Sequence, residues 1–165
     1  NGQDDGSDAY LRPLQIYREI DLALQRVKAV PGNVLFHGFS RGSANAYAIV
    51  AIDASKGRKY FSLAIASSGG VGLDYPPTRE ITSGRMGEQP LRGTRWLTVA
   101  GARDPEPQRD GIPGMRRTAE WLTTQGAVVI ERIEDVAGGH GALMTNPDNA
   151  RHALDLFEGA NAQRR

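Results

Sequence analysis

A serine between two glycines is the first feature of this sequence that could do chemistry. The segment Gly38-Phe39-Ser40-Arg41-Gly42 has the form Gly-x-Ser-x-Gly. It follows the apolar run 33–37 and precedes the alanine-rich stretch 41–55, so we expect a sharp turn between a buried strand and a helix. Such a turn holds its serine in a strained backbone conformation with the hydroxyl exposed, and we expect side chains at the two flanking glycine positions, 38 and 42, to collide with neighbouring elements. Ser40 is therefore a candidate nucleophile.

A serine nucleophile needs a base to accept its proton and a third group to orient that base. Asp104 follows the apolar run 95–100, and His140 stands between glycines after the apolar run 127–133. If both runs are parallel strands, these side chains and Ser40 meet at the carboxyl ends of the strands, where open α/β sheets build their sites. Glu106 and Asp110 are alternatives to Asp104 as the orienting acid.

The elements that must position these residues alternate along the chain. We expect strands at 33–37, 60–66, 95–100 and 127–133, and helices at 41–55, at 114–125 and through Phe157. A first helix starts at Pro13, with Ile16, Ile20, Ala23, Leu24 and Val27 at helical spacing on its inner face. This alternation predicts an α/β fold with a mostly parallel sheet and helices on both faces.

The remaining segments are predicted to lack regular structure. Residues 1–12 are polar and rich in Gly and Asp, which is typical of a loop. Residues 71–93 contain three prolines and no periodic pattern, so we interpret them as a long excursion between strands. We therefore expect one partial α/β domain over residues 1–165.

Composition excludes several classes of function. The 165 residues are 39% hydrophobic and 24% charged, with a formal net charge of +1, which is typical of one globular domain. No long block of like charge indicates a nucleic-acid or membrane-surface role, and no apolar run approaches the ~20 residues that span a bilayer. The absence of cysteine excludes thiol catalysis and thiolate-bound zinc. No paired-histidine motif is present, so we expect neither a metal nor another cofactor.

Three segments together resemble the α/β-hydrolase superfamily of serine esterases and lipases. They are the elbow at residues 38–42, Gly-Ala-Arg-Asp-Pro at 101–105 and Gly-Gly-His-Gly at 138–141. The resemblance implies a catalytic triad in which Ser40 attacks, His140 is the base and Asp104 is the orienting acid. It also implies that the backbone N–H of Arg41 is one oxyanion donor.

The activity that the resemblance implies is hydrolysis of a small-molecule carboxylic ester through an acyl-enzyme on Ser40. A peptidase or amidase and an acyltransferase use the same three residues, so they are alternatives within enzymes. A non-catalytic hydrolase-like domain that binds a ligand is an alternative from a different class. We expect no nucleic-acid partner and no membrane span.

One part of the family's pattern is missing. In the family, further strands precede the elbow strand, and a loop after an early strand supplies the second oxyanion donor. No such strand is found here, which would leave residues 33–39 as an exposed apolar edge. We therefore expect a missing N-terminal segment or a complementary chain to complete the sheet, in preference to two copies paired edge to edge.

Overall fold

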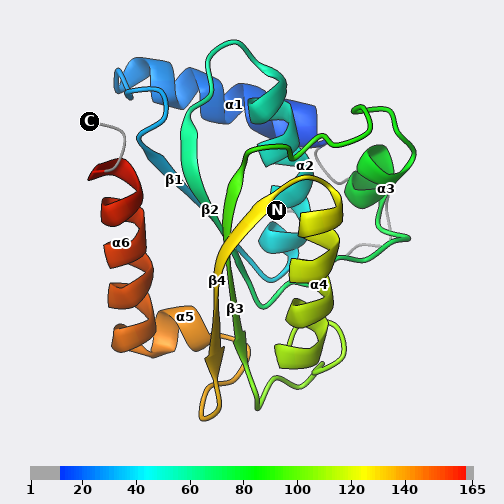
Figure 1. The fold of residues 1–165 in the computed structure, drawn as a ribbon, viewed down its shortest axis with the longest axis vertical. Helices are drawn as coiled ribbons and strands as arrows, with labels where there is room; N and C mark the ends of the chain where they lie inside the picture. Colours follow the sequence, from blue (N-terminus) through cyan, green and yellow to red (C-terminus); the bar gives the residue numbers. More distant parts are fainter. Residues whose placement is uncertain (1–11, 163–165) are drawn as a thin grey trace.

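Four parallel strands form the centre of the molecule, with helices on both faces (Figure 1). The computed structural model describes residues 12–162. The strands are β1 (Val34–Phe39), β2 (Phe61–Ser67), β3 (Arg95–Gly101) and β4 (Val128–Asp135), and they lie side by side in this order. Every neighbouring pair is parallel, which confirms the predicted fold class. The carboxyl ends of the four strands therefore lie at one edge of the sheet. The loop predicted at 1–12 lies outside the described residues, except for residue 12.

Two helical segments differ from the prediction. The helices are α1 (Pro13–Arg26), α2 (Arg41–Ser55), α3 (Pro76–Thr82), α4 (Ile112–Thr124), α5 (Ala142–Thr145) and α6 (Pro147–Ala162). The excursion predicted at 71–93 contains α3, because Pro76 and Pro77 occupy the first helical turn, where proline is well accommodated. The single last helix is divided into α5 and α6, because Asn146 precedes a proline and is extended, with φ −111° and ψ 106°.

The core has two sides because successive side chains of a strand point to opposite faces. On one face, Ala64 and Ala66 of β2 pack with α2, α3 and α4. On the other face, Leu63 and Ile65 of β2 pack with α5 and α6. Trp96 of β3 is fully buried on the first face. Strands buried on both faces explain the near-continuous apolar runs in the sequence.

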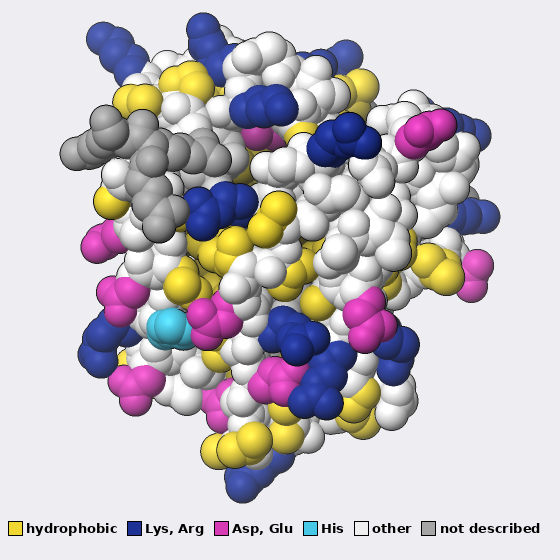
Figure 2. Space-filling model, in the orientation of Figure 1, with side chains coloured by type: hydrophobic (Ala, Val, Ile, Leu, Met, Phe, Trp, Pro, Cys, Tyr) yellow, Lys and Arg dark blue, Asp and Glu magenta, His cyan; other side chains and the backbone are white. Residues whose placement is uncertain are grey.

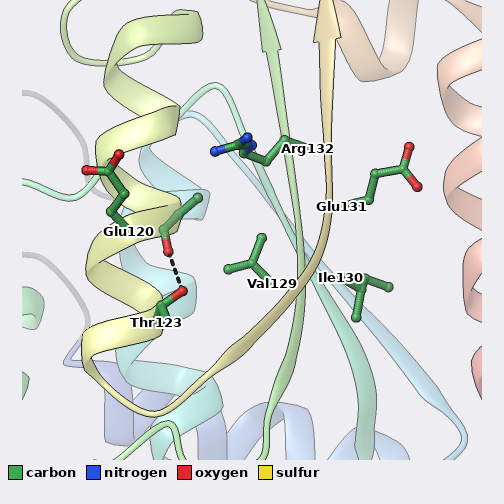
Figure 3. A pocket seen from close by; sticks show the side chains of 7 residues that line it. Glu120, Thr123, Val129, Ile130, Glu131 and Arg132 are labelled. Atoms are coloured by element: carbon green, nitrogen blue, oxygen red, sulfur yellow. Dashed lines mark hydrogen bonds between the residues drawn. The ribbon is translucent and has the colours of Figure 1, made fainter.

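Strand β4 contains a bulge that changes which side chains face each helix. Trp96 pairs with Val129 and Leu97 with Glu131, so Ile130 is the extra residue. Figure 3 shows the result: Val129 and Arg132 point toward α4, whereas Ile130 and Glu131 both point to the opposite side. The space between α4 and β4 is a pocket of about 470 Å³ that none of the predicted site residues lines.

Helix α1 packs on α2 through Tyr17 and the half-buried Ile16 and Ile20. The prediction that Ala23 and Val27 face inward is wrong. Ala23 is exposed, and Val27 lies beyond the last helical residue, Arg26, and is 72% exposed. The hydroxyl of Tyr17 donates to Asp53 Oδ1 at 3.0 Å. This carboxylate is buried and also accepts two backbone N–H groups at the start of β2. The bond from Tyr17 therefore joins α1 to a buried charge at the end of α2.

Tyr17→Phe tests this link between α1 and α2. Removing a hydrogen bond to a buried charged group should lower the free energy of unfolding by about 1.5–3 kcal/mol. Urea denaturation should show a lower midpoint with an unchanged slope. Tyr60→Phe is the matched control, because its hydroxyl faces the exposed Arg58 at 3.4 Å, and it should cost less. Equal losses in the two variants would contradict the assignment.

Candidate active site

Ser40 lies at the turn between β1 and α2, with φ 53° and ψ −122°. A positive φ is strained for a residue with a side chain. Its backbone is fixed on both sides: the N–H donates to Ser67 O at 2.9 Å, and the C=O accepts the N–H groups of Ser43 and Ala44. The strand before Ser40 and the helix after it therefore hold this strained turn, as the sequence predicts.

His140 joins the other two predicted residues. Its Nε2 lies 2.9 Å from Ser40 Oγ, and its Nδ1 lies 2.8 Å from Asp104 Oδ2. The Asp104 side chain is fully buried, and its Oδ1 accepts the backbone N–H of Glu106 at 2.9 Å. Asp110 is instead ion-paired with Arg109 at 2.8 Å. The structure thus places Asp104 beside the imidazole, in the position for which Glu106 and Asp110 were alternatives.

The partners of the imidazole determine where its proton lies. An ionised carboxylate only accepts hydrogen bonds, so the tautomer with the proton on Nδ1 is the one that can donate to an ionised Asp104. Nε2 then presents its lone pair to the hydroxyl of Ser40, which donates. The Phe39 ring packs against the imidazole, with centroids 5.1 Å apart. This is the protonation pattern that a general base requires.

Asp135, which was not among the residues predicted from the sequence, holds the loop that carries His140. This residue ends β4, and its carboxylate accepts four hydrogen bonds. Oδ1 accepts the backbone N–H groups of Ala137 and Gly138, and Oδ2 accepts the side-chain amides of Asn146 and Asn149, at 2.8–3.0 Å. These donors, the Asn146 amide above all, lower the pKa of Asp135. The signal in the sequence is a short-range Asp turn before a glycine pair.

The loops that carry the acid and the base are packed against each other. Backbone N–H groups of Ala102 and Arg103 donate to the carbonyls of Asp135 and Gly138, both at 2.9 Å. A Cβ on Gly101 would lie 2.3 Å from Gly139 O, so only glycine allows this approach. The spacing between Asp104 and His140 is therefore set by direct contact between their loops.

The elbow needs only one of its two glycines for space. A Cβ on Gly38 would lie 2.6 Å from Gly42 O, whereas a Cβ on Gly42 would meet no described atom within 4 Å. The expectation of crowding at both positions is therefore wrong for Gly42, which faces an open groove beside β1. A third glycine, Gly69 after β2, does pack on the elbow, since its Cβ would lie 2.0 Å from Ser40 O.

Two cavities adjoin the elbow. A pocket of about 270 Å³ lies on the side of β2, and its lining includes Ser40, Gly69, Gly70, Tyr75 and Arg109. A groove of about 730 Å³ runs on the other side between β1 and α1, and its lining is mainly apolar: Ile16, Ile20, Phe36, Phe39 and Ile49. Arg41 lines both cavities. Ser40 is therefore reachable from a cavity large enough for a small acyl group.

The same side chains do not define a metal centre. Ligand atoms of Asp104, Asp110 and His140 lie within 4.8 Å of one another. Both imidazole nitrogens, however, are already hydrogen-bonded, and the carboxylate of Asp110 is paired with Arg109. A metal ion would have to displace these partners. The three side chains are therefore better described as members of a hydrogen-bond network than as metal ligands.

The chain was compared with known proteins. No family model matches it, and no curated protein matches it. Solved structures do match, with the following similarity. A carboxylesterase from Mesorhizobium loti is 22% identical with a TM-score of 0.64, over 94% of this chain and 70% of that one. Arabidopsis thaliana SOBER1 is 16% identical with a TM-score of 0.65, over 90% and 64%. A Rhizomucor miehei esterase is 13% identical with a TM-score of 0.66, over 98% and 62%.

These similarities define the class of fold. The chain has the α/β-hydrolase fold, and the identities of 13–22% carry the comparison no further than the fold. The chain spans 61% and 64% of the lengths of two of the matched structures, a protein of unknown function from Agrobacterium tumefaciens and SOBER1. Among residues 12–162, no helix has the length and apolar character needed to cross a bilayer.

Gly38→Ala and Gly42→Ala form a matched pair that tests the packing of the elbow. Gly38→Ala should lower the free energy of unfolding by about 1–3 kcal/mol, because the added methyl collides with the α2 backbone. Gly42→Ala should be neutral or stabilising by up to about 1 kcal/mol, because alanine favours a helix more than glycine does. Urea unfolding curves measure both. If both variants lose the same unfolding free energy, the methyl group at position 42 also meets a neighbour, and the groove beside β1 is not open there.

The lowered pKa of Asp135 predicts a pH dependence of stability. A carboxyl whose pKa is lower in the folded state stabilises the fold above its unfolded pKa, near 3.9. That contribution is lost as the pH falls through the folded pKa. Wild type should therefore exceed Asp135→Asn in unfolding free energy at neutral pH, and the gap should close in acid. Asp155→Asn, at an exposed site on α6, is the control. A gap independent of pH would refute the role of the charge.

Proposed function

We propose that this chain carries the catalytic centre of a serine hydrolase that cleaves carboxylic esters through an acyl-enzyme on Ser40. The observation that carries the proposal is the position of the His140 imidazole, hydrogen-bonded to Ser40 Oγ on one side and to Asp104 on the other. The matched structures include proteins described as carboxylesterases and esterases, which favours ester over amide substrates.

In the first half of the proposed reaction, Ser40 Oγ attacks the ester carbonyl carbon while His140 Nε2 takes the hydroxyl proton. The imidazolium that forms is stabilised by the buried Asp104 carboxylate. When the tetrahedral intermediate collapses, the bond to the alcohol oxygen breaks and His140 returns the proton to that oxygen. The alcohol leaves and the acyl group remains on Ser40.

In the second half, water is the nucleophile. His140 Nε2 takes a proton from water, whose oxygen attacks the acyl carbon, and the proton then passes to Ser40 Oγ as the carboxylic acid leaves. Both tetrahedral intermediates carry a negative oxygen. Arg41 is the first residue of α2, and amides of a first helical turn point toward the helix N-terminus, so its backbone N–H is the proposed oxyanion donor.

The proposed site also requires a second oxyanion donor and a partner for β1. Strand β1 is the edge of the described sheet, and the apolar groove of about 730 Å³ lies beside it. We propose that a further strand, from an N-terminal segment or a complementary chain, pairs with β1 and brings this donor. Loss of one oxyanion donor lowers turnover by about 10²–10³. Residues 1–165 alone should therefore react slowly. For this reason the labelling rate of each variant is compared with that of the unsubstituted chain of the same length.

Labelling with a fluorescent organophosphonate tests the nucleophile directly. We expect one adduct on Ser40, no adduct in Ser40→Ala, and loss of nearly all labelling in His140→Ala. Ser40→Ala should keep the thermal unfolding midpoint, since the substitution removes only a hydroxyl whose partner among residues 12–162 is His140. Asp104→Asn should slow labelling by about 10⁴, because the imidazole then adopts the wrong tautomer.

The same experiment separates the alternatives. The labelling is repeated on a form of the protein in which a further strand pairs with β1. If that form gives no adduct, the domain is a non-catalytic binding domain and the proposal is refuted. If Ser40 is labelled, paired ester and amide substrates with the same acyl group come next. Faster cleavage of the amide would make the protein a peptidase or amidase.

A further inference from the structure

The end of the molecule opposite Ser40 carries a concentration of positive charge. In a parallel sheet the amino ends of all strands lie at one edge, and here this is the edge away from the site. Cationic residues precede three of the four strands: Arg26 and Lys28 before β1, Lys56, Arg58 and Lys59 before β2, and Arg85 and Arg92 before β3. The sequence contains no long block of like charge and for that reason predicts no membrane-surface role, but the topology gathers charges that are scattered along the sequence. We call this end of the molecule the basic face.

The loops of the basic face are continuous. The N–H of Gly32 donates to the carbonyl of Lys59 at 2.8 Å, which joins the loops before β1 and β2. A cavity of about 570 Å³ joins the loops before β2 and β3, with Lys59, Arg85 and Arg92 around it. Its remaining lining is neutral, and much of it is apolar: Ala51, Ile52, Ala54, Ser55, Met86, Gln89 and Pro90. Among residues 12–162, no acidic side chain lines it.

Acidic side chains offset little of this charge. Asp21 on α1 interacts with Arg58, and Glu88 is exposed in the loop before β3. Within residues 12–162, the salt bridges of arginine all involve other positions, namely Arg109, Arg116 and Arg151. Two arginines of the basic face have neutral partners as well, because Arg92 donates to the Gln89 side chain and Arg58 to the Tyr60 hydroxyl. These partners do not neutralise the cations, so most of the positive charge of the basic face remains uncompensated.

Apolar side chains project from the same face. Val27 is 72% exposed and Val30 63% exposed, and they alternate with Arg26 and Lys28 in the loop after α1. Figure 2 shows Lys and Arg side chains at the upper end of the molecule, over α1, with hydrophobic side chains between them. Exposed valines serve no purpose in binding a small soluble anion, whereas both kinds of side chain suit the interface of a bilayer.

We propose that the basic face docks on a membrane surface rich in anionic phospholipid. The cations contact lipid phosphates, the cavity between Lys59 and Arg92 takes a headgroup, and Val27 and Val30 enter the interfacial layer. Each cation near such a surface strengthens binding about fivefold at low salt. In this orientation the Ser40 end of the sheet faces away from the bilayer. The inference is independent of the proposed esterase activity.

Vesicle sedimentation with the full chain tests the proposal. The protein should sediment with vesicles of equal parts phosphatidylcholine and phosphatidylglycerol, should stay in solution with phosphatidylcholine alone, and should be released by salt. The triple variant Lys59→Gln, Arg85→Gln, Arg92→Gln should bind about 100-fold more weakly. The control removes three cations elsewhere, Arg117→Gln, Arg132→Gln and Arg151→Gln, and should bind nearly as wild type. Circular dichroism confirms that both variants fold.

Val27→Trp reports whether the loop after α1 enters the interfacial layer. The tryptophan fluorescence should shift to shorter wavelength on anionic vesicles, because the indole leaves water.

The proposal is overturned if the protein fails to bind anionic vesicles at low salt, or if the two triple variants lose binding equally. It is also overturned if pyrophosphate or an oligonucleotide binds at the basic face while the Val27→Trp emission does not shift on vesicles.

Discussion

The two hydrogen bonds of the His140 imidazole constrain the arrangement of the whole sheet, because both of its partners must be held in place. For His140 to lie 2.9 Å from Ser40 Oγ and 2.8 Å from Asp104, the ends of β1, β3 and β4 must be fixed relative to one another. A parallel sheet achieves this because the carboxyl ends of its strands meet at one edge. The fold is therefore the means by which residues a hundred positions apart come into contact.

Precision at this edge comes from close backbone contact. Gly38 and Gly69 let α2 and the loop after β2 touch the elbow, and Gly101 lets the acid loop touch the base loop. Asp135 then uses four hydrogen bonds to fix the chain between β4 and α6. Each of these residues acts on Ser40, Asp104 or His140 through the backbone.

Most of the fold and the meeting of three side chains could be predicted from local patterns. Apolar runs marked the buried strands, and Ser40, Asp104 and His140 each stood at the end of one. Features that depend on tertiary contacts could not be predicted. The open space beside Gly42, the outward position of Val27 and the bulge at Ile130 depend on which elements pack against them. Asp135 was missed because its partners Asn146 and Asn149 lie 11 and 14 residues further along the chain, and a contact over that distance leaves no local pattern.

The contact between Phe39 and His140 limits how freely the His140 side chain can rotate. An imidazole on the surface can rotate about its side-chain bonds, and each rotation would break both of its hydrogen bonds. Here the ring of Phe39, the residue just before the serine, packs against the imidazole and opposes rotation toward that side. The strand that leads to Ser40 thereby also restrains His140, which couples the positions of the two side chains when the loops fluctuate.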